Sequence, residues 1–357
     1  MRDGFLFRVR RTARAPLTLA AIAVTLGACS DALDTDTTVG LEIAVANRVS
    51  GTLTFVSARE LSTREQGLAP GADPTTLATR DFRLLVALGA ADALESRSAL
   101  GPGIVIPLAP GSGATGVAIQ DDSIAWVGNP GLDLLTRVNY LTGDTSGFPV
   151  GPVPRAIVLP APDLLYVVNS NTPIDDPGGP SSISWFTLSP GGMPGDGGTI
   201  PLTGLNARFA TVGDDGLVYV VASGTPGQGD GRLSIVDPAT HREIAVINHL
   251  GESPGPPVYH PSGRLLIASL SEGILEIDTA RRDVLRGPGN GVKPDGDGVA
   301  VVVLDTRGRV YAVAPGDCES DGALHMLRPP SDYEVIETVP VGVCPSAAAL
   351  VGLSPIN

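Results

Sequence analysis

The chain has 357 residues, and its 38 Asp and Glu residues outnumber its 24 Lys and Arg residues, which gives a net charge of −14. Such an acidic chain lacks the basic surface that binds nucleic acid or anionic lipid headgroups, which excludes both classes of partner. The 45 glycines and 32 prolines supply turns and interrupt helices, and no long stretch has amphipathic helical periodicity, so the composition favours an all-β protein.

The N-terminal residues have the pattern of a secretory signal. Five arginines stand among the first 14 residues, and an apolar run from Ala15 to Leu26 follows them. This run is shorter than the roughly 20 residues that a membrane-spanning helix needs. We therefore expect residues 1–28 to be a signal peptide that is removed on export.

The end of this segment, Leu26-Gly27-Ala28-Cys29, resembles the bacterial lipobox, whose cysteine receives diacylglycerol and is acylated after cleavage. More than one acyl chain on Cys29 gives stable anchoring. The alternative is an ordinary signal that leaves Cys29 unmodified. Because Ser30 follows the cysteine, the signal resembles those of outer-membrane lipoproteins. We expect a lipid-anchored protein of the cell envelope, on its periplasmic or surface face, with residues 29–38 as a tether.

A short apolar run, rich in β-branched and aromatic residues, recurs seven times at intervals of about 40 to 50 residues. Each run is apolar throughout, as expected for a strand that is covered on both faces. Turns precede the runs, and further strand-like stretches such as 232–236 and 243–247 follow them. Four strands at this period are typical of a propeller blade. The seven runs are residues 41–47, 83–88, 123–129, 163–169, 216–222, 263–269 and 308–314.

The C-terminal segment supplies the strand that the first unit lacks. The first unit starts directly at a second strand, at Leu41, whereas residues 341–351 read as an inner strand with no unit of their own. Pairing the two would close the ring and remove the open edges of a linear sheet. The sequence therefore predicts a single domain over residues 39–353, a seven-bladed β-propeller closed by the C-terminal strand.

Two motifs carry a family resemblance. Tyr166-Val-Val-Asn169 and the turn in Ile235-Val-Asp-Pro-Ala-Thr240 resemble the repeats of the YVTN/YncE-type seven-bladed propellers, and the resemblance covers about residues 38 to 352. It implies the fold far more strongly than a function, because this fold hosts lactonases, lyases, redox subunits, surface-layer proteins and binding modules.

Propellers usually bind ligands where the innermost strands begin around the channel. Arg155 and Arg208 occupy equivalent positions of this kind in neighbouring units, where two guanidinium groups can hold a carboxylate or phosphate. Alternatively, they pair with local acids or face water. Asp73 and Asp297 are further candidates for ligand contact. The loops that enter the innermost strands are expected to reach the channel near Pro74, Thr115, Pro154, Asn206, Gly255, Pro294 and Pro345.

Catalytic and metal sites have weaker support. Asp295 and Asp297 alternate with glycines as calcium ligands do, but further carboxylates are missing and Asp-Gly pairs are common turns. The four histidines do not converge, which argues against a catalytic triad or a histidine-rich metal site. The sequence contains no haem-attachment motif, and its glycine-rich loops precede no helix, so we expect no cofactor.

Two cysteines remain if Cys29 is lipidated. Cys318 follows a second strand and Cys344 precedes a first strand, which places both on the same face of neighbouring blades. We expect them to form a disulfide that fastens the closing strand. A redox-active pair would favour a tighter Cys-x-x-Cys motif.

The function predicted from these features is that of a binding or scaffolding module. Its partner would be a protein or a small molecule on the face where the innermost strands begin, and it would contact the membrane only through the lipid. The alternative is a lactonase-like hydrolase that uses carboxylates or a metal at the channel mouth, with Asp297 and Asp73 as the acids.

Overall fold

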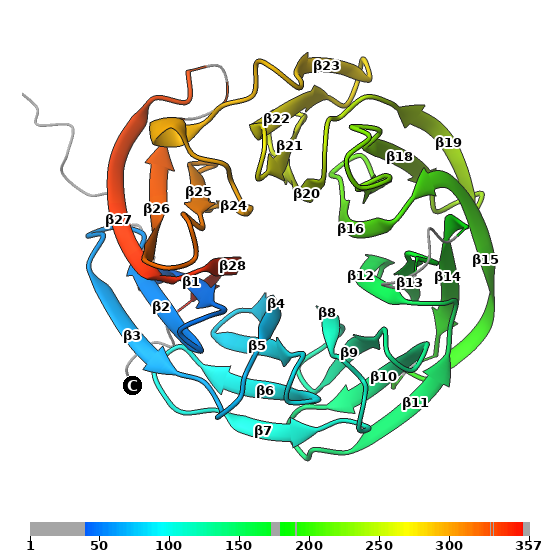
Figure 1. Ribbon diagram of the computed structural model, residues 1–357. Coiled ribbons are helices and arrows are strands. Elements are labelled where there is room, and N and C mark those ends of the chain that lie inside the picture. The colour runs from blue at the N-terminus through cyan, green and yellow to red at the C-terminus, as the bar shows by residue number, and fades with distance from the viewer. Residues whose placement is uncertain (1–39, 173–178, 190, 329, 331, 353–357) are drawn as a thin grey trace, which may run out of the picture. The chain divides into compact units, whose positions relative to one another are not determined.

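The computed structural model describes residues 40–172, 179–189, 191–328, 330 and 332–352. These residues form seven four-stranded sheets, which stand as blades around a common axis (Figure 1). The predicted seven-bladed all-β propeller is confirmed. The chain from Thr38 to Asn357 is one compact unit, and the predicted signal peptide (residues 1–28) and the whole predicted tether (residues 29–38), including Cys29, fall outside the described residues. In the described part of the chain, no helix is long and apolar enough to cross a membrane.

The strands of each blade are antiparallel and, except in blade 1, follow one another outward from the axis. Blade 1 consists of β28 (Pro345–Gly352), β1 (Leu41–Asn47), β2 (Thr52–Ser57) and β3 (Thr63–Gly67). Blade 2 consists of β4 (Pro74–Arg80), β5 (Arg83–Leu88), β6 (Ala93–Ser98) and β7 (Ile104–Pro107). Blade 3 consists of β8 (Thr115–Ile119), β9 (Ile124–Asn129), β10 (Leu134–Asn139) and β11 (Thr145–Pro149).

The remaining blades repeat this order. Blade 4 consists of β12 (Pro154–Ala161), β13 (Leu164–Asn169), β14 (Pro180–Leu188) and β15 (Pro194–Leu205). Blade 5 consists of β16 (Ala207–Val212), β17 (Val218–Ala222), β18 (Arg232–Asp237) and β19 (Arg242–Ile247). Blade 6 consists of β20 (Pro254–His260), β21 (Arg264–Ser269), β22 (Gly273–Asp278) and β23 (Asp283–Arg286), and blade 7 of β24 (Val301–Leu304), β25 (Val310–Ala314), β26 (Asp321–Leu327) and β27 (Val335–Val343).

The second strand of each blade is buried on both faces, which explains its continuous apolar sequence. In β1, Ile43 and Val45 pack toward blade 7, whereas Ala44 and Ala46 pack toward blade 2. Among the described residues, each of the seven spaces between neighbouring blades is filled by its own hydrophobic cluster. The core of the protein is therefore divided among the blade interfaces.

The ring is closed as predicted, by the C-terminal strand. β28 pairs antiparallel with β1, from Leu41 opposite Gly352 to Asn47 opposite Pro345. β28 begins at Pro345, where the entry to this strand was expected, whereas Val341 and Val343, which were read as part of the closing strand, belong to β27. The positive φ of Cys344 separates the two strands, which a continuous apolar sequence does not reveal.

Candidate functional site

A cavity of 720 Å³ lies at the mouth of the central channel. Its wall is formed mainly by the first residues of the innermost strands, such as Pro74 of β4, Thr115 of β8 and Ala347 of β28. Small-molecule sites in proteins commonly have volumes of about 300–1,000 Å³. The face on which the sequence predicted ligand binding therefore carries a cavity of the size that holds a small organic molecule.

A β-bulge displaces one residue from the ladder near the start of six of the seven innermost strands. In β12, Pro154 pairs with Asn169 and Ala156 pairs with Val168, which leaves Arg155 as the extra residue. Bulges re-aim side chains and are common at barrel rims and beside functional sites. Each of the six bulges contributes to the cavity wall, through Thr75, Gly116, Arg155, Arg208, Pro256 and Ser346.

The innermost strands of blades 3 and 4 approach each other closely at Gly116. Its φ is +53°, and a Cβ at this position would lie 2.3 Å from the carbonyl oxygen of Arg155. Glycine alone fits both this left-handed conformation and this distance. The Gly116 amide also donates a hydrogen bond to Thr76 Oγ1 of blade 2 at 3.2 Å. Close packing thus fixes the backbone that carries Arg155.

Arg155 and Arg208 come from adjacent bulges, and neither forms an ion pair with a described residue. Burial lowers the pKa of both guanidinium groups, and the positive charge of Arg208 lowers the pKa of Arg155 further. The buried Nε of Arg155 has no hydrogen-bond partner in the described structure. Since arginine remains protonated in proteins, the cavity holds two neighbouring positive charges without an acidic partner.

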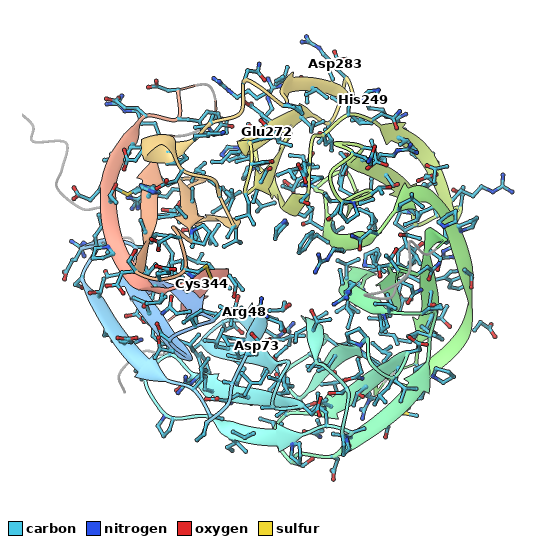
Figure 2. The ribbon with its side chains drawn as sticks, viewed as in Figure 1. Arg48, Asp73, His249, Glu272, Asp283 and Cys344 are labelled. Carbon is cyan, nitrogen blue, oxygen red and sulfur yellow. A yellow bond between two sulfur atoms is a disulfide. The ribbon has the colours of Figure 1, made fainter. Side chains whose placement is uncertain are left out.

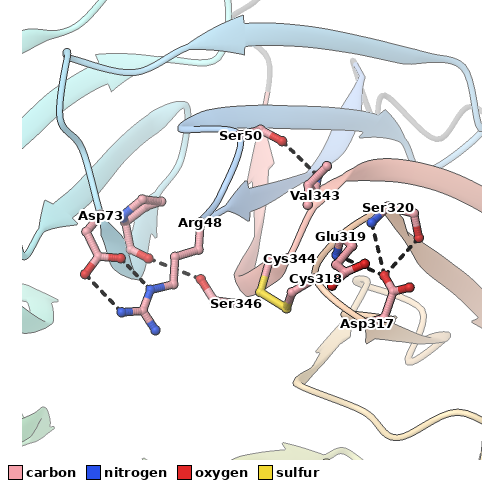
Figure 3. Close-up of a disulfide and its surroundings, with 11 residues drawn as sticks. Arg48, Ser50, Asp73, Asp317, Cys318, Glu319, Ser320, Val343, Cys344 and Ser346 are labelled. Atoms are coloured by element: carbon pink, nitrogen blue, oxygen red, sulfur yellow. Dashed lines mark hydrogen bonds and ion pairs between the residues drawn. A yellow bond between two sulfur atoms is a disulfide. The ribbon is translucent and has the colours of Figure 1, made fainter.

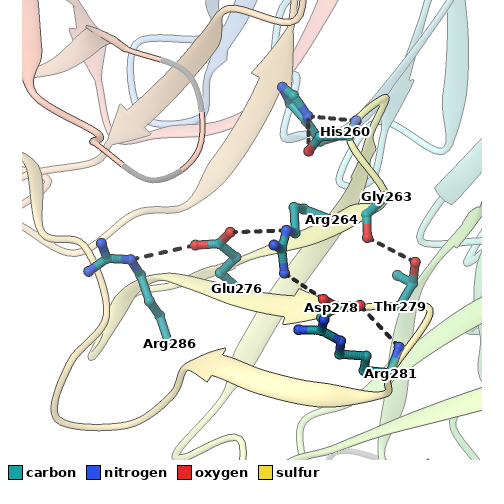
Figure 4. Close-up of polar contacts among 9 residues, drawn as sticks. His260, Gly263, Arg264, Glu276, Asp278, Thr279, Arg281 and Arg286 are labelled. Carbon is teal, nitrogen blue, oxygen red and sulfur yellow. Dashed lines mark hydrogen bonds and ion pairs between the residues drawn. The ribbon is translucent and has the colours of Figure 1, made fainter.

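Arginines on the blades have a different environment. In blade 6, the guanidinium of Arg264 lies between Glu276 and Asp278, with Nη1 2.9 Å from Asp278 Oδ2 (Figure 4). Arg286 approaches the other oxygen of Glu276 at 3.5 Å. In this group the acids neutralise the bases, whereas Arg155 and Arg208 lack such neighbours.

Asp73 lines the cavity but is already paired. Nε and Nη2 of Arg48 donate hydrogen bonds to its two carboxylate oxygens at 2.5 and 3.2 Å. Figure 2 shows both side chains close together beside the central opening. Asp73 is the only acid among the described residues of the cavity wall. Arg48 was missed in the sequence, although it directly follows the second strand of blade 1 and therefore emerges on this face.

Asp295 and Asp297 do not belong to the cavity. In the loop that enters the innermost strand of blade 7, Pro294–Gly296 form a short 3-10 helix, η1, and the strand itself begins at Val301. Asp295 Oδ2 lies 3.3 Å from His325 Nδ1 of β26, a strand in the outer half of the blade. No group of three or more His, Cys, Asp or Glu side chains is placed to hold a metal ion in the described ranges. The calcium interpretation therefore finds no further ligands there.

The four histidines also lie outside the cavity wall and apart from one another. His241 stacks on Trp185, with the ring centroids 3.9 Å apart. His260 contacts the Gly308 carbonyl oxygen through Nε2. Burial lowers the pKa of His325, and the carboxylates of Asp295 and Asp297 oppose that shift. His249 follows β19 and is distant from the channel mouth (Figure 2).

Hydroxyl groups in the cavity wall are used to join neighbouring blades. Ser346 Oγ donates to the Pro74 carbonyl oxygen at 3.1 Å, and Thr75 Oγ1 donates to the Ala114 carbonyl oxygen at 2.8 Å. Neither hydroxyl has a histidine or a free carboxylate beside it as a general base. The arrangement suits binding of an anion better than nucleophilic catalysis.

Cys318 and Cys344 are joined by a disulfide beside the cavity (Figure 3). Cys344 directly precedes β28, and its carbonyl oxygen accepts a hydrogen bond from the Arg48 amide at 3.0 Å. The Arg48 side chain in turn holds Asp73. The disulfide thus fixes the start of the closing strand and the backbone of one cavity residue.

No protein-family model matches the chain, and no curated protein matches its sequence. Solved structures match its fold at low sequence identity. A streptogramin B lyase is similar over 76% of this chain and 86% of its own, with a TM-score of 0.61 and 14% identity. Hydrazine synthase from Kuenenia stuttgartiensis (79% and 90%, TM-score 0.63, 14% identity) and apo AztD from Citrobacter koseri (88% and 98%, TM-score 0.54, 13% identity) are also similar. These likenesses establish a shared propeller fold.

Proposed function

We propose that the protein is a lipid-anchored binding module of the cell envelope, whose channel mouth binds a small molecule through a carboxylate or phosphate group. The observation that carries this proposal is the neighbouring pair Arg155 and Arg208, which lacks an acidic partner although the chain as a whole has a net charge of −14. Guanidinium groups bind such oxyanions through paired, charge-assisted hydrogen bonds. The solved propellers of similar fold include both enzymes and other proteins, so the fold does not indicate a function. The function is therefore inferred from the residues of the site.

The energetics of the arginine pair favour an anionic ligand. The positive charge of exposed Arg208 acts unfavourably on half-buried Arg155, and the buried Nε of Arg155 is left unpaired. A buried polar group without a partner costs about 1–3 kcal/mol. An oxyanion between the two guanidinium groups would relieve the repulsion and supply the missing acceptor.

Removal of both arginines should strongly weaken this binding. In the unit from Thr38 to Asn357, Arg155→Ala with Arg208→Ala should weaken binding of inorganic phosphate and of acetate about tenfold or more per arginine, because each charge-assisted hydrogen bond contributes about 1.5–3 kcal/mol. Isothermal titration calorimetry at low ionic strength measures the change. Added salt should weaken binding to the unaltered unit.

The matched control removes the same charge elsewhere. Arg59 and Arg242 are exposed and do not line the cavity, so Arg59→Ala with Arg242→Ala should leave anion binding nearly unchanged. An equal loss in this control would attribute binding to overall charge and overturn the site. Absence of binding by the unaltered unit to either anion would overturn the proposed function itself.

The envelope location in this proposal rests on the sequence around Cys29. The arginine-rich start, the short apolar run and Leu26-Gly27-Ala28-Cys29 support export and lipidation. We expect the full chain to incorporate a labelled fatty acid and to fractionate with membranes. Cys29→Ser should lose the label and, where the signal is still cleaved, release the protein from membranes; an equally labelled variant would contradict lipidation at this residue.

The repeat itself is best assigned to the YVTN/YncE type, which forms part of the same proposal. Tyr166-Val-Val-Asn169 supplies most of β13, and the turn after β18 contains Asp237-Pro238-Ala239-Thr240. The side chain of Asp237 accepts hydrogen bonds from Ala239 N and Thr240 Oγ1. These bonds stabilise the turn and explain why the motif contains Asp and Thr.

The hydrolase alternative has less support. It needs two acids or a metal at the channel mouth, but Asp73 is held by Arg48 and Asp297 lies beyond the cavity wall. A virginiamycin B lyase of similar fold is described as catalytically inactive when one histidine is replaced by alanine. In this chain none of the four histidines lines the cavity.

A further inference from the structure

Behind the rim, most residues that line the cavity are apolar. Arg155 and Arg208 stand at the bulges near the strand starts, and the next residues along the same strands, Ile157, Phe209 and Ala210, also line the cavity. Leu77, Val117 and Pro257 of other innermost strands are apolar as well, whereas Thr76 of β4 is polar. The cavity therefore combines a positive rim with a hydrophobic interior.

The apolar wall continues on the side of the channel that faces the arginines. Neighbouring innermost strands contact one another around the ring in the order β28, β4, β8, β12, β16, β20, β24. β28 is thus three positions away from both β12 and β16, across the channel (Figure 1). Ala347 and Ala348 of β28 contribute small apolar side chains to the cavity wall. A ligand group bound at the arginines would have its remaining atoms directed toward this surface.

We propose that the ligand is an amphiphile, in which one carboxylate or phosphate group is attached to an apolar body such as an alkyl chain. The inference rests on the proposed function, because the arginine pair binds the charged group. The apolar body would occupy the cavity between β12, β16 and β28. A bare inorganic anion would leave the apolar wall in contact with water, and an apolar molecule without charge would leave the arginines unpaired.

The length of the ligand's alkyl chain provides the test. Burial of each additional methylene group should strengthen binding about fourfold until the cavity is filled. Titration of the Thr38–Asn357 unit with acetate, butyrate, hexanoate and octanoate, below micelle formation, should therefore give steadily lower Kd values. Octyl phosphate distinguishes a phosphate head from a carboxylate head. Octanol and octylammonium should bind far more weakly than octanoate, because neither carries an oxyanion.

Two variants separate the charged and apolar contributions. Arg155→Ala with Arg208→Ala should weaken all of the carboxylates by a similar factor. Ala348→Phe should fill part of the cavity and remove the gain from butyrate to octanoate, while acetate still binds. The length series uses the unaltered sequence, so the test stands even if a variant fails to fold.

The outcomes distinguish this inference from the proposed function. Equal affinity for acetate and octanoate would overturn the amphiphile while leaving an oxyanion site intact. Octanol binding as tightly as octanoate would show that the arginines do not contact the head group, which would also overturn it. Failure of every anion to bind would remove the proposed function as well.

Discussion

A chain that ends at Cys344, and therefore lacks β28, should fail to form a soluble monomer. β28 pairs with β1 along its whole length, and its Ala347 and Val351 are buried in the core between blades 1 and 2. Without it, the backbone edge of β1 and the apolar residues beside the channel would be exposed, and exposed edges promote aggregation. The loss is comparable to the total stability of a domain, about 5–15 kcal/mol. Circular dichroism and size-exclusion chromatography measure the outcome.

A circular permutant is the matched control for this truncation. Leu41 lies opposite Gly352 in the antiparallel pair, so a short linker can join the end of β28 to the start of β1. The permutant that starts at Pro345 and ends at Cys344 should fold and retain the cavity. A soluble, cooperatively unfolding truncated chain would show that closure by β28 is dispensable.

Replacing Cys318 and Cys344 with serine should lower the free energy of unfolding by about 3.5 kcal/mol, which is the loop-entropy value for a sequence separation of 26 residues. The disulfide reduces the number of conformations that the unfolded chain can adopt, and it fastens the strand that closes the ring. Urea unfolding followed by tryptophan fluorescence measures the change, and the m-value tests whether the transition remains cooperative.

Reduction of the unaltered protein provides the control for this pair. Its unfolding midpoint should move by the same amount as in the double serine variant, and the reductant should have no effect on that variant. If the free energy of unfolding falls by well below about 1 kcal/mol when the disulfide is removed, strain in the folded protein offsets the entropic gain, as engineered disulfides often show.

The sequence predicted the blades well because their second strands are determined locally. Packing against both neighbouring blades requires apolar residues at successive central positions of a strand such as β1, from Ile43 to Ala46, and this run is visible in the sequence. The missing first strand also had a visible sign, since the chain begins its repeat at Leu41. The extension of β27 to Val343 was not visible, because a turn at one residue with positive φ does not interrupt an apolar run.

The site was less predictable because it depends on irregular backbone. Arg155 and Arg208 were found through their equivalent places in the repeat, and the structure brings both into one cavity. The bulges that displace them from the ladder have no sequence signal of their own. Asp297 does not line the cavity, because it lies in the loop before the innermost strand of blade 7, which begins at Val301. Arg48 was missed because its partner Asp73 belongs to another blade.

The bulges have a consequence for how such a protein can change its ligand. A bulged residue stands outside the ladder pairing, and none of the six belongs to the hydrophobic clusters between the blades. Evolution or protein engineering can therefore replace the side chain of Arg155 or Arg208 with little effect on the packing of the blades, whereas the hydroxyls of Thr75 and Ser346 also join neighbouring blades. The ring acts as a constant scaffold with a set of interchangeable positions, whose charges select what enters the channel.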